Sequence, residues 1–179
     1  MEQMIFPRLV LEEGIWGWKH KGYWYDIGTI PDYLRANKEL LARFHASKPS
    51  KITAQSTTAS ATFTFQLLES RSGTGETGHG ATIKQPSFVG EGSTLHRGTT
   101  LGPGTILSRG VEVDEGSTIR DSIIFEYTSL GRDCVVDGAI VGERVTVGAG
   151  TRIGRGAMIA GEVSIPGHSL IKQKAVVLN

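Results

Sequence analysis

The sequence predicts a mainly β fold, in which a solenoid of short strands follows a small α+β segment. Two observations carry this prediction: aliphatic residues recur every six positions from Ile83 to Ile171, and residues 1–46 do not share that period. A period of six matches neither an α-helix nor a flat strand, so it indicates a repeated structural unit. The frame slips by one residue before Ile124 and again before Val141. The repeated aliphatic residues are Ile83, Val89, Leu95, Leu101, Leu107, Val113, Ile119, Ile124, Leu130, Val136, Val141, Val147, Ile153, Ile159, Ile165 and Ile171.

Each unit has three characteristic positions: an aliphatic residue first, often a glycine second, and a small residue fifth. We expect the second-position glycine to relieve a turn by adopting φ > 0, so that valine at Gly148 or Gly154 should destabilise the fold. We expect the small fifth residue to fill the corner of a triangular coil. Cys134 occupies such a position, so we expect it to pack in the core. The fifth positions hold Ser93, Thr99, Thr105, Val111, Ser117, Cys134, Val145, Thr151, Ala157, Val163 and Ser169.

This pattern resembles the left-handed parallel β-helix of hexapeptide-repeat proteins, and it covers residues 83–179. The resemblance implies that three short strands close each coil and that successive coils stack through backbone hydrogen bonds. Because each coil of such a solenoid contacts only its neighbours, we expect it to be stable only as a stack.

Composition excludes several classes of function. The chain has 179 residues, a net charge of +1 and one cysteine. A charge so close to zero argues against nucleic acid as a partner, and a single cysteine forms no internal disulfide. Because no apolar run reaches the length of a membrane span and the N-terminus lacks the layout of a signal peptide, we expect a cytoplasmic protein with no membrane partner.

Residues 1–46 predict a helix, a hairpin and a second helix. Met1–Leu11 has the pattern of a short helix. Ile15–His20 and Tyr23–Ile27 alternate as two strands around a turn at Lys21–Gly22. We therefore expect a β-hairpin in this part of the chain.

The second helix is predicted to run from a cap at Thr29 to about Ala46. Pro31 suits the first turn, and Asp32 lies three residues after the cap. One stripe of the helix is mostly apolar, and it consists of Ile30, Tyr33, Leu34, Asn37, Leu40, Leu41 and Phe44.

This N-terminal segment is too small to form a core by itself. We expect its apolar side to dock on the solenoid, on another copy of the chain, or on a part that the sequence does not contain. That side consists of Ile5, Phe6, Leu9, Ile15, Trp16, Trp18, Trp24 and Leu40.

Residues 47–82 are rich in Ser, Thr and Gly and are predicted to be a linker. Only Phe63–Leu68 is apolar enough to form a strand or to pack on the end of the solenoid. The glycine-rich run at 73–80 neither follows a strand nor opens a helix, so it is a weak phosphate-loop signal. The chain thus divides into three parts: 1–46, a linker at 47–82, and the β-helix at 83–179.

The sequences IFPRLV at 5–10 and GYWYDIGTIPDYLRANKELL at 22–41 carry a second resemblance. They are similar to the end of the nucleotidyltransferase domain in sugar-nucleotide pyrophosphorylases. Within that group they look most like mannose-1-phosphate guanylyltransferases and their glucose-1-phosphate relatives. In that family this stretch is followed by a helix and then by a left-handed β-helix, which is the order found here. Residues 1–46 thus resemble the C-terminal end of the catalytic domain.

The resemblance implies a role for Asp26 as a ligand of the catalytic Mg²⁺ in the complete enzyme. A hard divalent cation that bridges phosphates is held by one or two carboxylates and keeps several waters. Asp26 could instead simply end a strand and hydrogen-bond the turn that follows.

The family's Gly-x-Gly-Thr-Arg-Leu nucleotide loop is missing from this sequence, as is the sheet that would carry it. We therefore interpret the chain as the C-terminal portion of such an enzyme, starting at an internal methionine. We expect no catalytic residue, cofactor or nucleotidyl transfer in this chain alone. The complete enzyme would transfer a nucleotidyl group from an NTP to a sugar 1-phosphate, with the GDP-mannose type favoured. Its partners would be another copy of itself or a full-length or N-terminal nucleotidyltransferase subunit.

Two other functions remain open from the residues. One is a stand-alone structural or regulatory β-helix that forms oligomers through its flat faces. The other is a hexapeptide-repeat acyltransferase, which would use a histidine base such as His168. A zinc site of three histidines is not expected, because the solenoid contains only His96 and His168.

Overall fold

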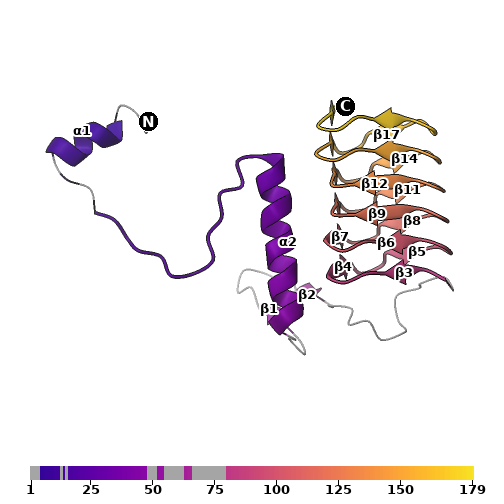
Figure 1. Cartoon of the computed structure of the whole chain (residues 1–179), viewed down its shortest axis with the longest axis horizontal. Helices are drawn as coiled ribbons and strands as arrows, with labels where there is room; N and C mark the ends of the chain where they lie inside the picture. Colours follow the sequence, from indigo (N-terminus) through magenta and orange to yellow (C-terminus); the bar gives the residue numbers. More distant parts are fainter. Residues whose placement is uncertain (1–4, 13, 15, 48–51, 55–62, 66–79) are drawn as a thin grey trace.

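The computed structural model describes residues 5–12, 14, 16–47, 52–54, 63–65 and 80–179 (Figure 1). Residues 80–179 form a left-handed parallel β-solenoid, as the six-residue period predicts. The helices α1 (Ile5–Glu12) and α2 (Ile30–Ser47) precede it, and α2 runs alongside the stack of coils (Figure 1).

Three parallel sheets form the walls of the solenoid, and each strand pairs with the strand three places away in the chain. The first sheet has the order β19 (Val176–Val177), β16 (Met158–Ile159), β13 (Ile140–Val141), β10 (Ile123–Ile124), β7 (Thr105–Leu107), β4 (Ser87–Val89). The second sheet has the order β17 (Ser164–Ile165), β14 (Thr146–Val147), β11 (Ser129–Leu130), β8 (Glu112–Val113), β5 (Thr94–Leu95). The third sheet has the order β18 (Leu170–Ile171), β15 (Arg152–Ile153), β12 (Val135–Asp137), β9 (Thr118–Arg120), β6 (Thr100–Leu101), β3 (Thr82–Ile83).

The core is a column of aliphatic side chains, and the repeat predicted most of it. Every predicted aliphatic residue lies in this core; all are buried except Ile83, Val89 and Ile171, which are partly buried near the two ends. The sequence pattern missed Val177, which also packs against the core. Burying such side chains contributes about 1.5–3 kcal/mol each, which makes the column the main source of stability.

The prediction that second-position glycines adopt φ > 0 is wrong. Gly148 and Gly154 have no positive φ, whereas fourth-position residues such as Gly150 (φ 71°) do. The second position is instead where neighbouring coils come close. A Cβ on Gly148 would overlap the backbone of the next coil, 2.7 Å from Gly167 Cα, and one on Gly154 would lie 3.0 Å from Gln173 N.

The fifth-position residues fill the corners as predicted, and several also join two coils through hydrogen bonds. Ser117 Oγ donates to Gly131 O at 2.7 Å and accepts from Cys134 N at 2.9 Å. Thr128, at the fifth position of the unit that starts at Ile124, does the same with Gly142 O and Val145 N. At this position the small side chain fits the corner, and its hydroxyl joins two coils by hydrogen bonds.

Cys134 is fully buried at one of these corners, which confirms its predicted place in the core. Its Sγ donates to Gly148 O at 3.3 Å. Burial raises the pKa of the thiol above its ordinary value, so the group stays protonated and unreactive.

Replacing Ser117 by alanine should lower the free energy of unfolding by about 1–3 kcal/mol. The change removes the hydroxyl that bridges two coils and leaves the buried amide of Cys134 without its partner. Urea unfolding followed by circular dichroism measures the loss. Ser169→Ala is the matched control, because the hydroxyl of the half-buried Ser169 donates to Pro166 O, three residues earlier in the chain. An equal loss in both variants would contradict the bridging role.

The hairpin predicted in residues 15–27 is wrong. Residues 16–21 and 23–28 contain no strand, and Ile15 lies outside the described residues. Trp16 and Trp18 are 99% and 93% exposed. An isolated two-stranded hairpin is marginal in water, and no described sheet pairs with this segment.

The two helices agree with the prediction within a residue or two where they are described. α2 begins after the Thr29 cap and ends at Ser47. α1 ends at Glu12, and Met1–Met4 lie outside the described residues. None of the described helices is long and apolar enough to cross a membrane.

Part of the linker forms a small sheet, in which β1 (Ile52–Ala54) pairs antiparallel with β2 (Phe63–Phe65). Phe63–Phe65 thus forms a strand, which was one of the two options left open for Phe63–Leu68 within the predicted linker. The glycine-rich run lies outside the described residues up to position 79.

Candidate functional site

Asp26, the predicted metal ligand, lies in an exposed turn just before α2. Gly28 N donates to Asp26 Oδ1 at 3.2 Å, so the carboxylate closes the turn that follows it. The Asp26 residue as a whole is exposed. Within the described part of the chain, no group of three or more His, Cys, Asp or Glu side chains is arranged to hold a metal ion.

The chain enters α2 directly from this turn through a side-chain cap. Asp32 N donates to Thr29 Oγ1 at 3.2 Å, and Thr29 Oγ1 donates to Asp32 Oδ2 at 2.5 Å. Tyr33 N donates to Thr29 O at 2.9 Å, which starts the helical ladder. The turn and the helix therefore form one unit.

Two tyrosines bind the preceding segment to the side of α2. The rings of Tyr23 and Tyr25 stack with centroids 6.1 Å apart. Arg43 lies over the Tyr23 ring at 4.8 Å and Arg35 over the Tyr25 ring at 5.3 Å. The Tyr23 hydroxyl donates to Ala36 O at 3.2 Å. These contacts hold residues 23–25, and so the Asp26 turn, against the helix.

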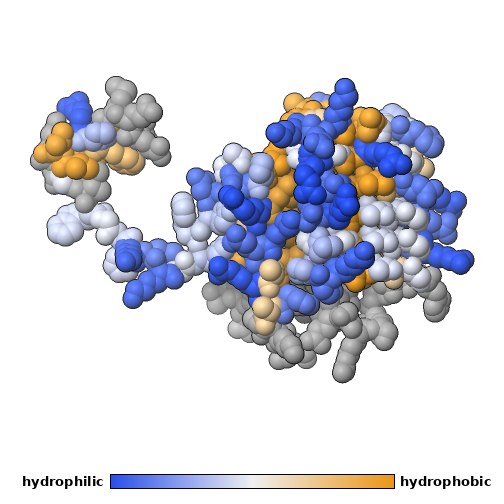
Figure 2. Space-filling model, in the orientation of Figure 1, coloured by the Kyte–Doolittle hydropathy of each residue, from blue (hydrophilic) through white to orange (hydrophobic). Residues whose placement is uncertain are grey.

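α2 packs against the outer face of the first sheet. Ile123 and Ile140 point away from the core column yet are only 4% and 9% exposed, and Ala36 and Leu41 of α2 are also buried. Figure 1 shows α2 parallel to the stack beside β4 and β7, and Figure 2 shows hydrophobic side chains running along the solenoid between hydrophilic ones. Docking on the solenoid, one of the three options that the sequence left open, therefore applies to α2 alone. The other described members of the predicted apolar side include Ile5, Phe6, Trp16, Trp18 and Trp24, which are exposed.

Charged groups fix the helix at the corner between the third and first sheets. Lys38 Nζ lies 2.6 Å from Asp121 Oδ1, and Arg155 reaches Asp121 at 3.3 Å and Asp137 at 2.6 Å. Arg120 also pairs with Asp137, at 3.0 Å. Partial burial raises the pKa of Asp121, but the bonds and charges of Lys38 and Arg155 outweigh it and bring that pKa below its ordinary value. Asp121 is therefore ionised at neutral pH.

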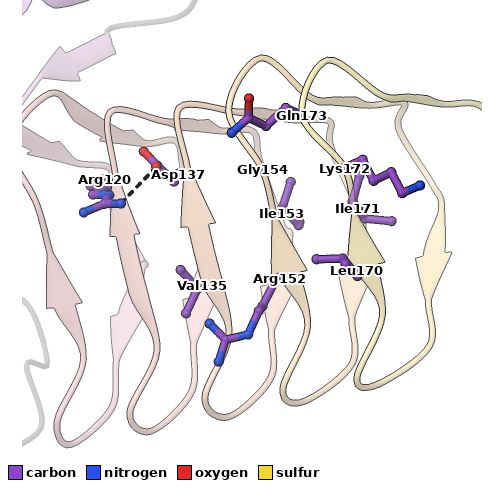
Figure 3. A pocket seen from close by; sticks show the side chains of 10 residues that line it. All are labelled: Arg120, Val135, Asp137, Arg152, Ile153, Gly154, Leu170, Ile171, Lys172 and Gln173. Carbon is purple, nitrogen blue, oxygen red and sulfur yellow. Dashed lines mark hydrogen bonds and ion pairs between the residues drawn. The ribbon is translucent and has the colours of Figure 1, made fainter.

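The outer face of the third sheet carries a shallow hollow of about 360 Å³ (Figure 3). Val135, Arg152 and Leu170 line its floor, and the Arg120–Asp137 pair lies at its edge. The rest of the lining includes Lys172 and Gln173, and the Asp137 carboxylate is already paired with Arg120 and Arg155.

The two solenoid histidines do not come together. His96 follows β5 and His168 follows β17, which are the two ends of the second sheet. His96 Nε2 lies 3.3 Å from Glu112 Oε1 on the surface, and His168 occupies a turn with φ 60°. Neither has the buried, oriented setting of a catalytic base.

The sequence missed the corner residues Lys38, Asp121 and Arg155. A signal for them was present, because both slips of the six-residue frame fall at this corner. Lys38, which pairs with Asp121 from α2, has no comparable signal in the sequence.

Comparison with known proteins bears on this arrangement. Residues 83–179 match the family described as the GMPPB C-terminal domain. The glucose-1-phosphate adenylyltransferase of Acetivibrio thermocellus is 31% identical over 97% of the chain. The match covers 39% of that enzyme, so the chain spans about two fifths of the length of this curated relative.

Solved structures with this fold include acetyltransferases. The acetyltransferase domain of PglB from Neisseria gonorrhoeae superposes with a TM-score of 0.53 at 18% identity, over 55% of this chain and 49% of that one. GDP-perosamine N-acetyl transferase from Caulobacter crescentus gives 0.53 at 19% identity, over 55% and 48%. Identities this low show the common solenoid fold alone.

The family match covers the whole solenoid, and the relative's sequence extends the likeness through the Asp26 turn and α2. The family match and the relative both agree with the order seen in the sequence, in which the Asp26 motif is followed by a helix and then by the β-helix. The chain belongs to the GMPPB C-terminal domain family and corresponds to the C-terminal, hexapeptide-repeat portion of a sugar-nucleotide pyrophosphorylase.

Proposed function

We propose that the chain works as the C-terminal part of an NDP-sugar pyrophosphorylase of the GDP-mannose type, where it supports a catalytic domain that binds the NTP and the sugar 1-phosphate. The observation that carries this proposal is the exposure of the aromatic residues next to the Asp26 turn. Trp16, Trp18 and Trp24 are 99%, 93% and 76% exposed, while Tyr23 and Tyr25 of the same segment are held on α2. An aromatic surface of this kind fits against another protein surface.

In this role Asp26 contributes one carboxylate to Mg²⁺ when the catalytic domain is present. The residues fit such a use, since Asp26 is exposed and one of its oxygens stays outside the turn hydrogen bond. Mg²⁺ needs few protein ligands where phosphates and water supply the rest. The ion would neutralise charge on the phosphates, while α2 and the Tyr23–Tyr25 stack would hold the carboxylate in place.

The family description favours the mannose-1-phosphate guanylyltransferase type. We place the protein in the cytoplasm, acting as a homo-oligomer or beside a full-length nucleotidyltransferase subunit. The flat outer faces of the solenoid suit either arrangement.

Two chimeras test the proposal. In one, the chain replaces the matching C-terminal part of the Acetivibrio thermocellus adenylyltransferase; in the other, it replaces that part of a mannose-1-phosphate guanylyltransferase. We expect both to release pyrophosphate, and the second to keep the larger share of its parent's rate. Asp26→Asn in either chimera should lower kcat at least tenfold without changing its melting temperature. Two folded but inactive chimeras would refute the proposal, because the matched region would then fail to support catalysis.

A further inference from the structure

The two slips of the repeat lie one above the other at the same corner of the solenoid. Only two residues, 121 and 122, separate β9 from β10, and only 138 and 139 separate β12 from β13. Four residues, 154–157, make the same turn between β15 and β16. Backbone bonds stack the three turns, because Gly138 N donates to Arg120 O and Gly156 N to Gly138 O.

Arg155, on the full-length turn, reaches back over both shortened turns. Its guanidinium bonds Asp137 at 2.6 Å and Asp121 at 3.3 Å. Asp121 adopts φ 52°, so the first shortened turn is held in a left-handed conformation. The other two corners of the described solenoid also carry ion pairs, such as Arg132–Asp114 at 3.4 Å and Arg144–Glu162 at 2.6 Å, but the ion pair with α2 lies at this corner.

The space at this corner is shaped for Lys38. A Cβ on Gly104, in the turn beneath, would lie 2.8 Å from Asp121 Oδ1 and 2.9 Å from Lys38 Cε. The glycine thus leaves room for the ion pair to form. Asp121 is 24% exposed and Lys38 42% exposed, so water screens the pair only in part.

A continuous set of contacts connects this corner to Asp26. Asp121 bonds Lys38 in the middle of α2, the Thr29 cap joins α2 to the turn, and the Tyr23–Tyr25 stack fastens the other side of the turn to the helix. We propose that Asp121, presented by the paired short turns, is a positioning residue that fixes α2 and with it the Asp26 turn on the solenoid. The positional role rests on the proposed function; the docking role stands without it.

Hydrogen exchange of the full chain, followed by mass spectrometry at pH 7, tests the docking. Asp121→Asn keeps a residue that tolerates φ > 0 but removes the charge, so the backbone of the turn should be preserved. We expect peptides of α2 to exchange roughly five- to tenfold faster, since a partly buried charge-assisted bond is lost. Peptides of the solenoid should keep their protection.

Three further variants make the result specific. Asp133→Asn is the matched control, because Asp133 has φ 54° at a different corner and should leave α2 exchange unchanged. Asp121→Glu should restore most of the protection. Lys38→Met should match Asp121→Asn, and the double variant should be no worse than either one. Unchanged α2 exchange in Asp121→Asn, or an equal rise in Asp133→Asn, overturns the proposal.

The same substitution in an active chimera tests the positional role. Asp121→Asn should raise the Mg²⁺ concentration needed for half-maximal rate several-fold, and Asp121→Glu should reverse the change. An active chimera with an unchanged Mg²⁺ requirement would overturn positioning of Asp26. Loss of activity in both unsubstituted chimeras would bear on the proposed function instead, while the exchange result would still decide the docking.

Discussion

Gly148→Val should lower the free energy of unfolding by roughly 3 kcal/mol or more, one of the two largest effects we expect from a single substitution. A Cβ at this position would overlap the backbone of the next coil at Gly167. Overpacked side chains usually cost about 1–3 kcal/mol because neighbours can rotate away. Here the neighbour is a peptide backbone that the ladder holds on both sides, since Gly148 N donates to Ile165 O and His168 N to Ala149 O. Urea unfolding followed by circular dichroism measures the loss.

Two comparisons separate crowding from backbone conformation. Ala160 shows that a second position near the C-terminal end of the stack can carry a methyl group, although Ala160 N donates to Val177 O of the next coil. Gly92→Ala tests the other cause, since that glycine has φ 71° and nothing within 4 Å of a Cβ. We expect Gly92→Ala to cost about 1–2 kcal/mol. If Gly92→Ala were more damaging than Gly148→Val, conformation rather than crowding would dominate.

The repeat predicted the core because the inward direction of each side chain depends only on its position within one six-residue unit. Each aliphatic residue of the six-residue repeat points inward, so spacing alone locates the column. The role of the glycines could not be read in the same way. A glycine at 148 is required by Gly167, nineteen places later, and that contact exists only after the coils stack.

The N-terminal segment shows where a local pattern fails to predict structure. Alternation in residues 15–27 predicted strands, but strands need a partner, and the described chain offers none to this segment. The helix at 30–47 was predictable because its cap and its apolar stripe lie within it.

The candidate site was predictable in part. The motif around Asp26 marked the turn, and the turn bond to Gly28 was one of the two interpretations left open. The Lys38–Asp121 pair was not predictable, because its two residues lie 83 positions apart and belong to different parts of the chain. The slip at Asp121 marked an irregular corner, but the charge that meets it comes from α2.

Leu107→Ala should lower the free energy of unfolding by about 2–5 kcal/mol. Leu107 is 0% exposed in the middle of the aliphatic column and packs where β7 joins β4 and β10. Removing its side chain loses the burial of the removed carbons and leaves a cavity that the fixed coils above and below cannot close. Urea unfolding with a single transition, followed by circular dichroism, measures the change.

Leu170→Ala is the control for that substitution, because Leu170 has the same chemistry on a strand of the same solenoid but points outward and is 68% exposed. We expect a loss within about 0.5 kcal/mol. The contrast between the two leucines tests the central feature of the fold, that one residue in six supplies the stability while its outward neighbours leave the faces free. Equal losses would mean that Leu170 is covered in solution, and the outer face of the third sheet would then be an interface between copies of the chain.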